Sequence, residues 1–240
     1  MSDATSLPSS RSRTTTKPRH SLHLGRTFRS IMFAPRQGFE SAFKIARRRA
    51  RAGDVPVEGH APMMFSAFAG ASVMLLWLKV GGLIDVRDAT RSDFRWPYLV
   101  IALLVGVLLG IAVQRAWGWV GTRLIDALRA ETSSWQQRLI WGAASFPQIV
   151  TLFVLLPLDL LIVGAGAFTT DRLNETYRTV WAAFSISISL ALVLWSLYLF
   201  ARGIAVATEM DRSRVALTSL IAIVLISLVF ATPILAPVLL

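Results

Sequence analysis

The chain has 240 residues, of which 54% are hydrophobic and only 16% are charged, and its formal net charge is +11. A soluble domain of this length is less apolar and carries more charge, so the composition excludes an ordinary soluble protein. The absence of cysteine excludes disulfides, thiolate catalysis and cysteine metal sites. We expect an all-α integral membrane protein, because several stretches reach the roughly 20 apolar residues that cross a bilayer as a helix.

The basic charge is concentrated in the N-terminal region. Residues 1–60 hold 12 Lys or Arg against 4 Asp or Glu, whereas residues 61–240 hold 13 against 10. Residues 1–34 are predicted to form a disordered basic cytosolic tail, because a segment rich in Ser, Thr, Pro and Arg cannot bury a core. Such a tail can bind nucleic acid. In a membrane protein it is more typical of a segment held near anionic lipid, and no nucleic-acid partner is expected.

The following segment, residues 35–60, is predicted to be cytosolic and to contain a basic amphipathic helix over residues 35–52. Apolar residues recur on one face at helical spacing, and most of the basic residues lie opposite. Such a helix suits the plane of a membrane surface. The residues predicted to bind anionic lipid there are Arg36, Phe39, Phe43, Lys44, Arg47, Arg48 and Arg51. A helix packed on the cytosolic end of the bundle is the alternative, and the two interpretations are compatible.

A bundle of five transmembrane helices is predicted in residues 61–240. The predicted spans are about 61–84, 97–119, 138–166, 178–204 and 215–238. Ser134 and Gln137 have capping-box spacing at the start of the third span. The arginine cluster before the first span indicates that the N-terminus is cytoplasmic and the C-terminus outside. We therefore expect a multi-pass protein of the cell (inner) membrane.

The third predicted span contains Pro147 and Pro157, which are unusual inside a membrane helix. In lipid, the backbone groups that proline leaves unbonded must be satisfied by neighbouring helices or hydroxyls. This span is therefore predicted to be surrounded by protein more than by lipid. The expected hydroxyl donors lie on the fourth span and are Ser185, Ser187, Ser189 and Ser196.

Two opposite charges lie inside predicted spans. By the rise of a helix, Lys79 is about 27 Å along the first span and Asp159 about 30 Å along the third, so both approach the outer surface. A charge inside a span usually pairs with another charge or faces water. Three interpretations stand: an intramembrane charge pair, two side chains that reach the outer interface separately, or a role in moving protons or ions. Transport requires polar groups along the whole depth, and the middle offers only serines and Gln148.

No motif in the chain indicates an enzyme. The histidines, His20, His23 and His60, all precede the first span, and no further metal ligands accompany the pair His20 and His23. No carboxylate pair, hydroxyl–base couple or metal cluster has sensible spacing. We therefore expect no catalytic residue, no cofactor and no metal.

Two segments carry a resemblance to a known family. One is "GAASFPQIVTLFVLLPL" in the third span, and the other is "WSLYLFARGIAVATEMDRSRVALTSLIAIVL", with Trp195, Gly203 and Ala216 at matching positions. Together with the basic N-terminus and the segment "PRQGF", they resemble the bacterial branch of the Yip family, the Ypt/Rab-interacting membrane proteins. The resemblance covers residues 30–238 and implies a five-span membrane domain without known catalytic residues.

The predicted function follows from the layout and the resemblance. We expect a non-enzymatic scaffold, or a membrane-organising or trafficking-type factor, that acts through its basic helix and cytosolic loops. Its expected partners are the lipid bilayer, anionic lipid at the cytosolic face and other membrane proteins. The alternative is a transporter or permease component that uses Lys79 and Asp159.

Overall fold

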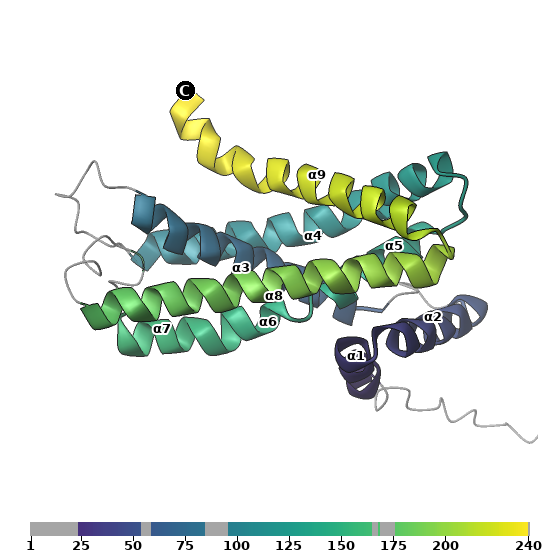
Figure 1. The fold of residues 1–240 in the computed structure, drawn as a ribbon, viewed down its shortest axis with the longest axis horizontal. Helices are drawn as coiled ribbons and strands as arrows, with labels where there is room; N and C mark the ends of the chain where they lie inside the picture. The colour runs from purple at the N-terminus through teal and green to yellow at the C-terminus, as the bar shows by residue number, and fades with distance from the viewer. Residues whose placement is uncertain (1–23, 54–58, 85–95, 165–167, 169–175, 240) are drawn as a thin grey trace, which may run out of the picture.

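A computed structural model describes residues 24–53, 59–84, 96–164, 168 and 176–239. All regular structure in these residues is helical. The helices in chain order are α1 (Leu24–Phe33), α2 (Pro35–Arg51), α3 (Ala61–Ile84), α4 (Trp96–Ala127), α5 (Ser134–Ala144), α6 (Gln148–Val150), a π-helical turn η2 (Thr151–Leu155), α7 (Leu156–Ile162), α8 (Thr176–Thr208) and α9 (Arg212–Leu239). The long helices run along one axis, and α9 diverges from them toward its C-terminal end (Figure 1).

Within the described residues, three helices are long and apolar enough to cross a membrane. They are α3 over Ala61–Val80, α4 over Trp96–Ala127 and α8 over Thr176–Thr208. Helix α5 and the stretch Gln148–Ile162 together meet the same criterion as one bent span. These helices indicate a membrane location. The α9 helix has 28 residues, and the presence of five spans stays a prediction.

Glycines bring α3 and α4 into close contact. A Cβ atom on Gly70 would collide with the backbone of Gly106 and Gly110, and a Cβ on Gly110 would collide with the carbonyl of Ser66. Such small residues let two helix backbones approach closely, which is a common way for membrane helices to associate. The pair α3–α4 is therefore a tightly joined hairpin that supports the rest of the bundle.

Helix α5 begins one residue earlier than the capping prediction. The N-cap is Ser133, and its backbone N–H donates to Oε1 of Gln136 at 2.8 Å. Gln137, which we expected in the cap, is instead fully buried and accepts a hydrogen bond from Trp117 Nε1 at 3.2 Å. The prediction was wrong because Ser133 and Ser134 both stand three residues before a glutamine, and the burial of Gln137 selects the first pair.

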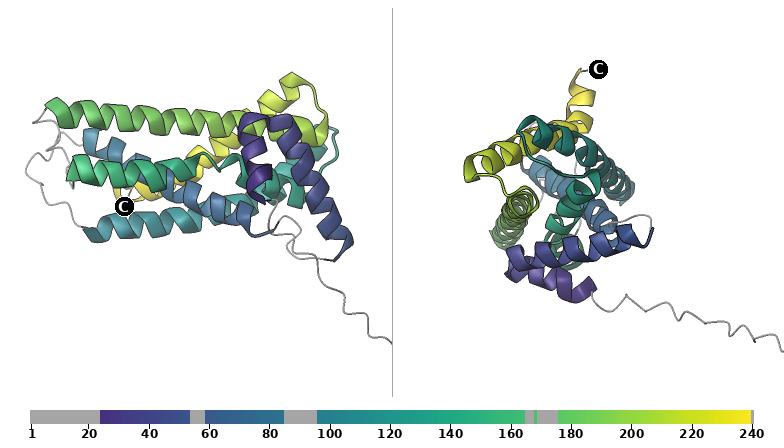
Figure 2. Two further views of the ribbon diagram at one scale, coloured as in Figure 1. Left: turned by 90° about the horizontal axis from the view of Figure 1, so that it is seen from below. Right: turned by 90° about the vertical axis from the view of Figure 1, so that its right-hand side faces the viewer.

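The N-terminal helices α1 and α2, together called the arm, pack on one end of the bundle. Figure 2 shows α2 running across the bundle axis at that end, which we call the arm end. The prediction of disorder for residues 1–34 is wrong for α1, since Phe28 and Ile31 of this helix are buried. Both side chains lie on one face at a spacing of three residues, which gives α1 an apolar stripe that α2 and the bundle cover.

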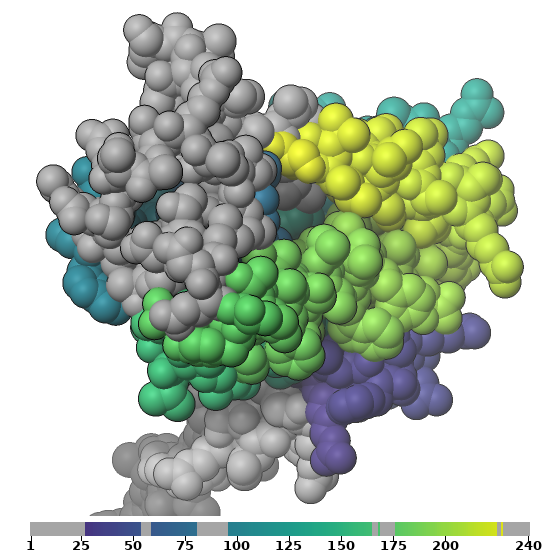
Figure 3. Space-filling view, turned by 60° about the vertical axis from the view of Figure 1, so that its left-hand side comes forward, coloured from purple at the N-terminus to yellow at the C-terminus, as the bar shows by residue number. Residues whose placement is uncertain are grey.

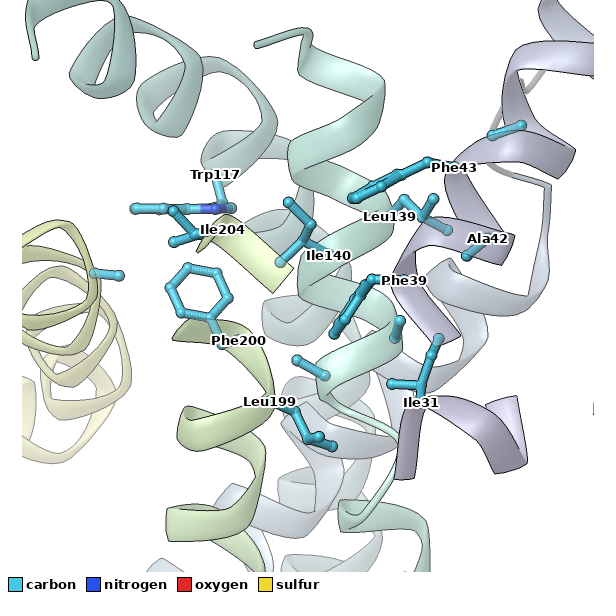
Figure 4. Close-up of a cluster of buried hydrophobic side chains, with 14 of the residues drawn as sticks. Ile31, Phe39, Ala42, Phe43, Trp117, Leu139, Ile140, Leu199, Phe200 and Ile204 are labelled. Atoms are coloured by element: carbon cyan, nitrogen blue, oxygen red, sulfur yellow. The ribbon is translucent and has the colours of Figure 1, made fainter. Parts of the chain in front are cut away.

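A single apolar cluster joins the arm to the bundle. Phe39 of α2 packs against Ile140 of α5 and next to Gly203 of α8 (Figure 4). Gly203 makes room for this ring, because a Cβ there would lie 2.9 Å from Phe39 Cζ. Aromatic rings continue the cluster, with Trp117 and Phe200 at a centroid distance of 5.3 Å. The arm end thus has a conventional hydrophobic core.

Candidate functional site

The third predicted span is bent where Pro147 interrupts it. Helix α5 ends at Ala144, and the following helical stretch is inclined to it by 44°. Proline has no N–H and its ring clashes with the preceding turn, so a helix bends or breaks at this residue. The carbonyl of Trp141 accepts both the N–H of Ser145 at 3.1 Å and its Oγ at 2.9 Å, so the last turn before the break is closed.

A π-helical turn, Thr151–Leu155, follows the break and precedes Pro157. The N–H of Leu156 donates to the carbonyl of Thr151, which is the wider bond of a π turn. Such turns are rare and occur frequently at functional sites. The Thr151 hydroxyl is buried and has no hydrogen-bond partner among the described residues. The turn therefore holds a polar group that the packing does not satisfy.

A hydroxyl group of α3 lies within hydrogen-bond distance of a backbone carbonyl near this turn. Ser72 Oγ lies 2.8 Å from the carbonyl of Gln148 and 2.9 Å from the carbonyl of Phe68 in its own helix, so its one proton is shared between the two acceptors. The expectation that serines of the fourth span would do this was wrong for Ser187 and Ser189, whose hydroxyls donate to carbonyls of their own helix. Serine readily bonds to the carbonyl four residues earlier in its helix, and this local partner is always within reach.

The bent span also has an exposed face. Leu161 is 81% exposed and Phe153 is 57% exposed. The prediction was that protein would surround this span more than lipid does, and buried residues do outnumber exposed ones in it. One face packs against α3 and α8, while the other is apolar and faces the surroundings of the bundle.

Lys79 of α3 and Asp159 of α7 form a salt bridge inside the bundle, and each side chain is only 2% exposed. Two groups on α8 complete the arrangement. Lys79 Nζ donates to Ser185 Oγ at 2.9 Å, and Trp181 Nε1 donates to Asp159 Oδ1 at 3.0 Å. Three helices thus contribute to one buried polar cluster, which we call the charge cluster. It lies toward the end of the bundle opposite the arm.

This geometry favours the intramembrane charge pair over two side chains that reach the outer interface separately. Lys79 and Asp159 do not reach separately to an interface, because they contact each other and are shielded from solvent. Apolar side chains lie close by, since Leu75, Leu99 and Val163 form a buried cluster toward the same end. Removing charges from water is expensive, and a buried pair repays that cost only with good geometry and further hydrogen bonds. An ionisable residue inside a membrane helix is by default a candidate functional residue.

The residues predicted to bind lipid form two groups on the arm, one exposed and one buried. Arg36, Lys44, Arg47, Arg48 and Arg51 are exposed on α2. Phe39 is fully buried and Phe43 is 5% exposed, and both belong to the core that joins the arm to the bundle. Their assignment to lipid contact is therefore not supported, because no face of either ring is available outside the protein. The alternative of a helix packed on the bundle describes α2 better.

The sequence interpretation missed two members of the charge cluster. Trp181 was not singled out, and Ser185 was expected to bond backbone rather than a lysine. Both lie on α8 four residues apart, which places them on one helix face. That spacing was visible in the sequence, but nothing in it indicated which neighbouring helix this face would meet.

Comparisons of the chain with protein-family models, with curated proteins and with solved structures gave no match. The resemblance to the Yip family therefore stays a prediction from the sequence.

Proposed function

We propose that this chain is a non-enzymatic scaffold of the cytoplasmic membrane that gathers anionic lipid around its cytosolic arm. The proposal includes five spans, a cytoplasmic N-terminus and the resemblance to the Yip family. One observation supports it above all: α2 is mounted on the bundle by Phe39 and Phe43, and its exposed face carries Arg36, Lys44, Arg47, Arg48 and Arg51. Because packing fixes the apolar face, the basic face has one orientation relative to the bundle.

The expected attraction is electrostatic. A basic residue near an anionic surface contributes about 1 kcal/mol, so a few of them suffice to enrich anionic lipid. Salt screens such interactions over about 8 Å at physiological ionic strength. The buried phenylalanines add no lipid contact that would survive high salt. The enrichment should therefore vanish almost completely as salt rises.

The test compares lipid selectivity in the reconstituted full chain. Spin-labelled phosphatidylserine and phosphatidylcholine report the fraction of each lipid that the protein immobilises. We expect a preference for phosphatidylserine that falls with salt and is largely lost in the variant Arg47→Gln, Arg48→Gln and Arg51→Gln. The matched control removes the same charge from Arg87, Arg91 and Arg95, which lie outside the described residues. Equal loss in both variants, or no preference in the wild type, would contradict the proposal.

The proposed orientation has its own test. The chain lacks cysteine, so single introduced cysteines can be labelled cleanly with an impermeant thiol reagent. Ser92→Cys and Asn174→Cys, both outside the described residues, should label from outside the cell, whereas Ser133→Cys should not. The reverse pattern would place the arm on the outer surface.

A second candidate function is transport of a proton or ion. The charge cluster favours it, together with the nearby π turn and the unpartnered hydroxyl of Thr151. Proteoliposomes loaded with a pH-sensitive dye and placed in an ion gradient separate the two functions. A transporter should dissipate the gradient, and the double variant Lys79→Gln with Asp159→Asn should not. Flux no greater than in protein-free liposomes would leave the scaffold function.

A further inference from the structure

Four exposed basic side chains form one compact group, which we call the basic quartet, on the last two turns of α2. They form two pairs four residues apart, Lys44 with Arg48 and Arg47 with Arg51. This spacing places all four on one face of the helix, within about 10.5 Å of helix rise. The opposite face is held by the core that joins the arm to the bundle, because Ala42 and Ala46 are buried there.

The described part of the chain supplies no counter-charge to the basic quartet. None of its members forms an ion pair or a hydrogen bond with a described residue. The acid on the same helix, Glu40, is paired with Arg36 at 3.1 Å. The helix dipole offsets only about half of one charge at the C-terminus of α2. Because like charges one turn apart repel each other, an anion with more than one charge would relieve the repulsion within the quartet.

The basic quartet is directed away from the bundle, close to the start of the first span. Viewed along the bundle axis, α2 lies at the edge of the bundle (Figure 2), and in the space-filling view the arm forms the edge of the molecule below α8 (Figure 3). The last turns of α2 approach α3, since a Cβ atom on Gly59 would collide with the guanidinium of Arg49 and α3 begins at Ala61. Lipid headgroups lie just outside the hydrocarbon core that a span crosses, so the quartet is placed to meet lipid phosphates.

These features favour a lipid that carries two phosphates. Guanidinium groups bind phosphate through strong charge-assisted hydrogen bonds, and the quartet offers two pairs of cations. When two phosphates belong to one molecule, the second binds at a high effective concentration once the first is bound. We propose that the basic quartet binds the headgroup of one diphosphate lipid of the cardiolipin type, with one pair of cations at each phosphate. This inference rests on the proposed function, because it names the lipid that the same basic face selects.

The test uses the full-length protein in detergent and native mass spectrometry. The protein is stripped of lipid and mixed with tetraoleoyl cardiolipin or with twice the molar amount of dioleoyl phosphatidylglycerol, so that phosphates and acyl chains are equal in number. Dioleoyl phosphatidylcholine serves as the neutral reference. We expect one cardiolipin per chain, at an occupancy at least about fivefold above that of phosphatidylglycerol. Arg47→Gln with Arg51→Gln removes one pair of cations and should lower cardiolipin occupancy at least about fivefold.

The matched control removes the same charge elsewhere on the arm. Arg29→Gln with Arg36→Gln alters two exposed residues outside the basic quartet and should leave cardiolipin occupancy unchanged. Circular dichroism checks that each variant is folded, and Lys44→Gln with Arg48→Gln replaces the first variant if that one is not.

The possible results separate this inference from the proposed function. Equal occupancy by cardiolipin and phosphatidylglycerol, with both above phosphatidylcholine, would overturn the inference and leave the proposed function standing. No excess of either lipid over phosphatidylcholine would overturn both. Undiminished cardiolipin binding in the quartet variant, or an equal loss in the control, would place the lipid at another site. Displacement of cardiolipin by equimolar inorganic pyrophosphate would assign the quartet to a soluble diphosphate instead of a lipid.

Discussion

The arm end and the charge cluster solve the same problem of placing charge in an apolar protein, and they solve it in opposite ways. At the arm end, apolar rings face inward and basic groups face outward, so no charge leaves water. In the charge cluster, Lys79 and Asp159 are both buried, and hydrogen bonds from and to α8 offset part of the cost. The first arrangement stabilises by apolar burial, whereas the second depends on each charge keeping its partner.

The contrast has a functional meaning under our proposals. A surface of exposed charges can interact with lipid headgroups without any change in the protein. A buried pair can respond only if the helices around it move or if it gains or loses charge. The π turn belongs to the span that is bent by 44°, whereas α4 and α8 are each one continuous helix.

The largest expected effect comes from breaking the charge pair. Asp159→Leu leaves Lys79 charged and buried, and we expect it to lower the free energy of unfolding by about 3–5 kcal/mol. The double variant Lys79→Met with Asp159→Leu removes both charges and should recover most of that loss. Denaturant unfolding in micelles measures both values. If the double variant is no more stable than Asp159→Leu, the two charges do not stabilise each other.

A somewhat smaller loss is expected at the arm end. Phe39→Ala leaves a cavity between α5 and α8 and should cost about 3 kcal/mol. Because the ring joins the arm to the bundle, limited proteolysis should cut the arm faster in this variant. Phe33→Ala is the control, since Phe33 is 82% exposed on the same arm. Equal protection of both variants would show that the arm is held by other contacts.

The π turn offers a test of intermediate size. Thr151→Val replaces an unpartnered buried hydroxyl by a methyl group of similar shape and should raise the free energy of unfolding by about 1 kcal/mol. Ser72→Ala removes the bond to the Gln148 carbonyl and should lower it by about 1 kcal/mol. Thermal unfolding of the two variants checks the opposite signs. A loss in Thr151→Val would indicate that the hydroxyl has a partner in the membrane.

The smallest effect is expected at the basic face. The variant Arg47→Gln, Arg48→Gln and Arg51→Gln should change the free energy of unfolding by no more than about 0.5 kcal/mol, because these side chains are exposed. The same variant should lose its preference for anionic lipid. A loss of stability above 1 kcal/mol would mean that these guanidinium groups hold the arm in place, and the two regions would then differ less than we describe.

The helical class, the positions of the long apolar helices and the two-sided character of α2 could all be predicted from the sequence. These features depend on the length of apolar runs and on the period of 3.6 residues, which any helix of that composition must express. The sequence also showed Pro147 inside the third span, but the prediction was a continuous span, and the 44° bend at this residue was seen only in the structure. The predicted boundaries of α3 agree with the structure, as both place this helix at residues 61–84.

The tertiary structure alone decided which faces meet. The sequence placed Lys79 and Asp159 at similar depth but could not show that their helices are adjacent. Nothing in it indicated that Trp181 would donate a hydrogen bond to Asp159. Periodicity identified the apolar face of α2, yet lipid and a neighbouring helix cover such a face equally well. Gly203 settled that choice, because the space it leaves on α8 admits the ring of Phe39. A helix period defines a face, whereas the partner of that face depends on packing between segments distant in the chain.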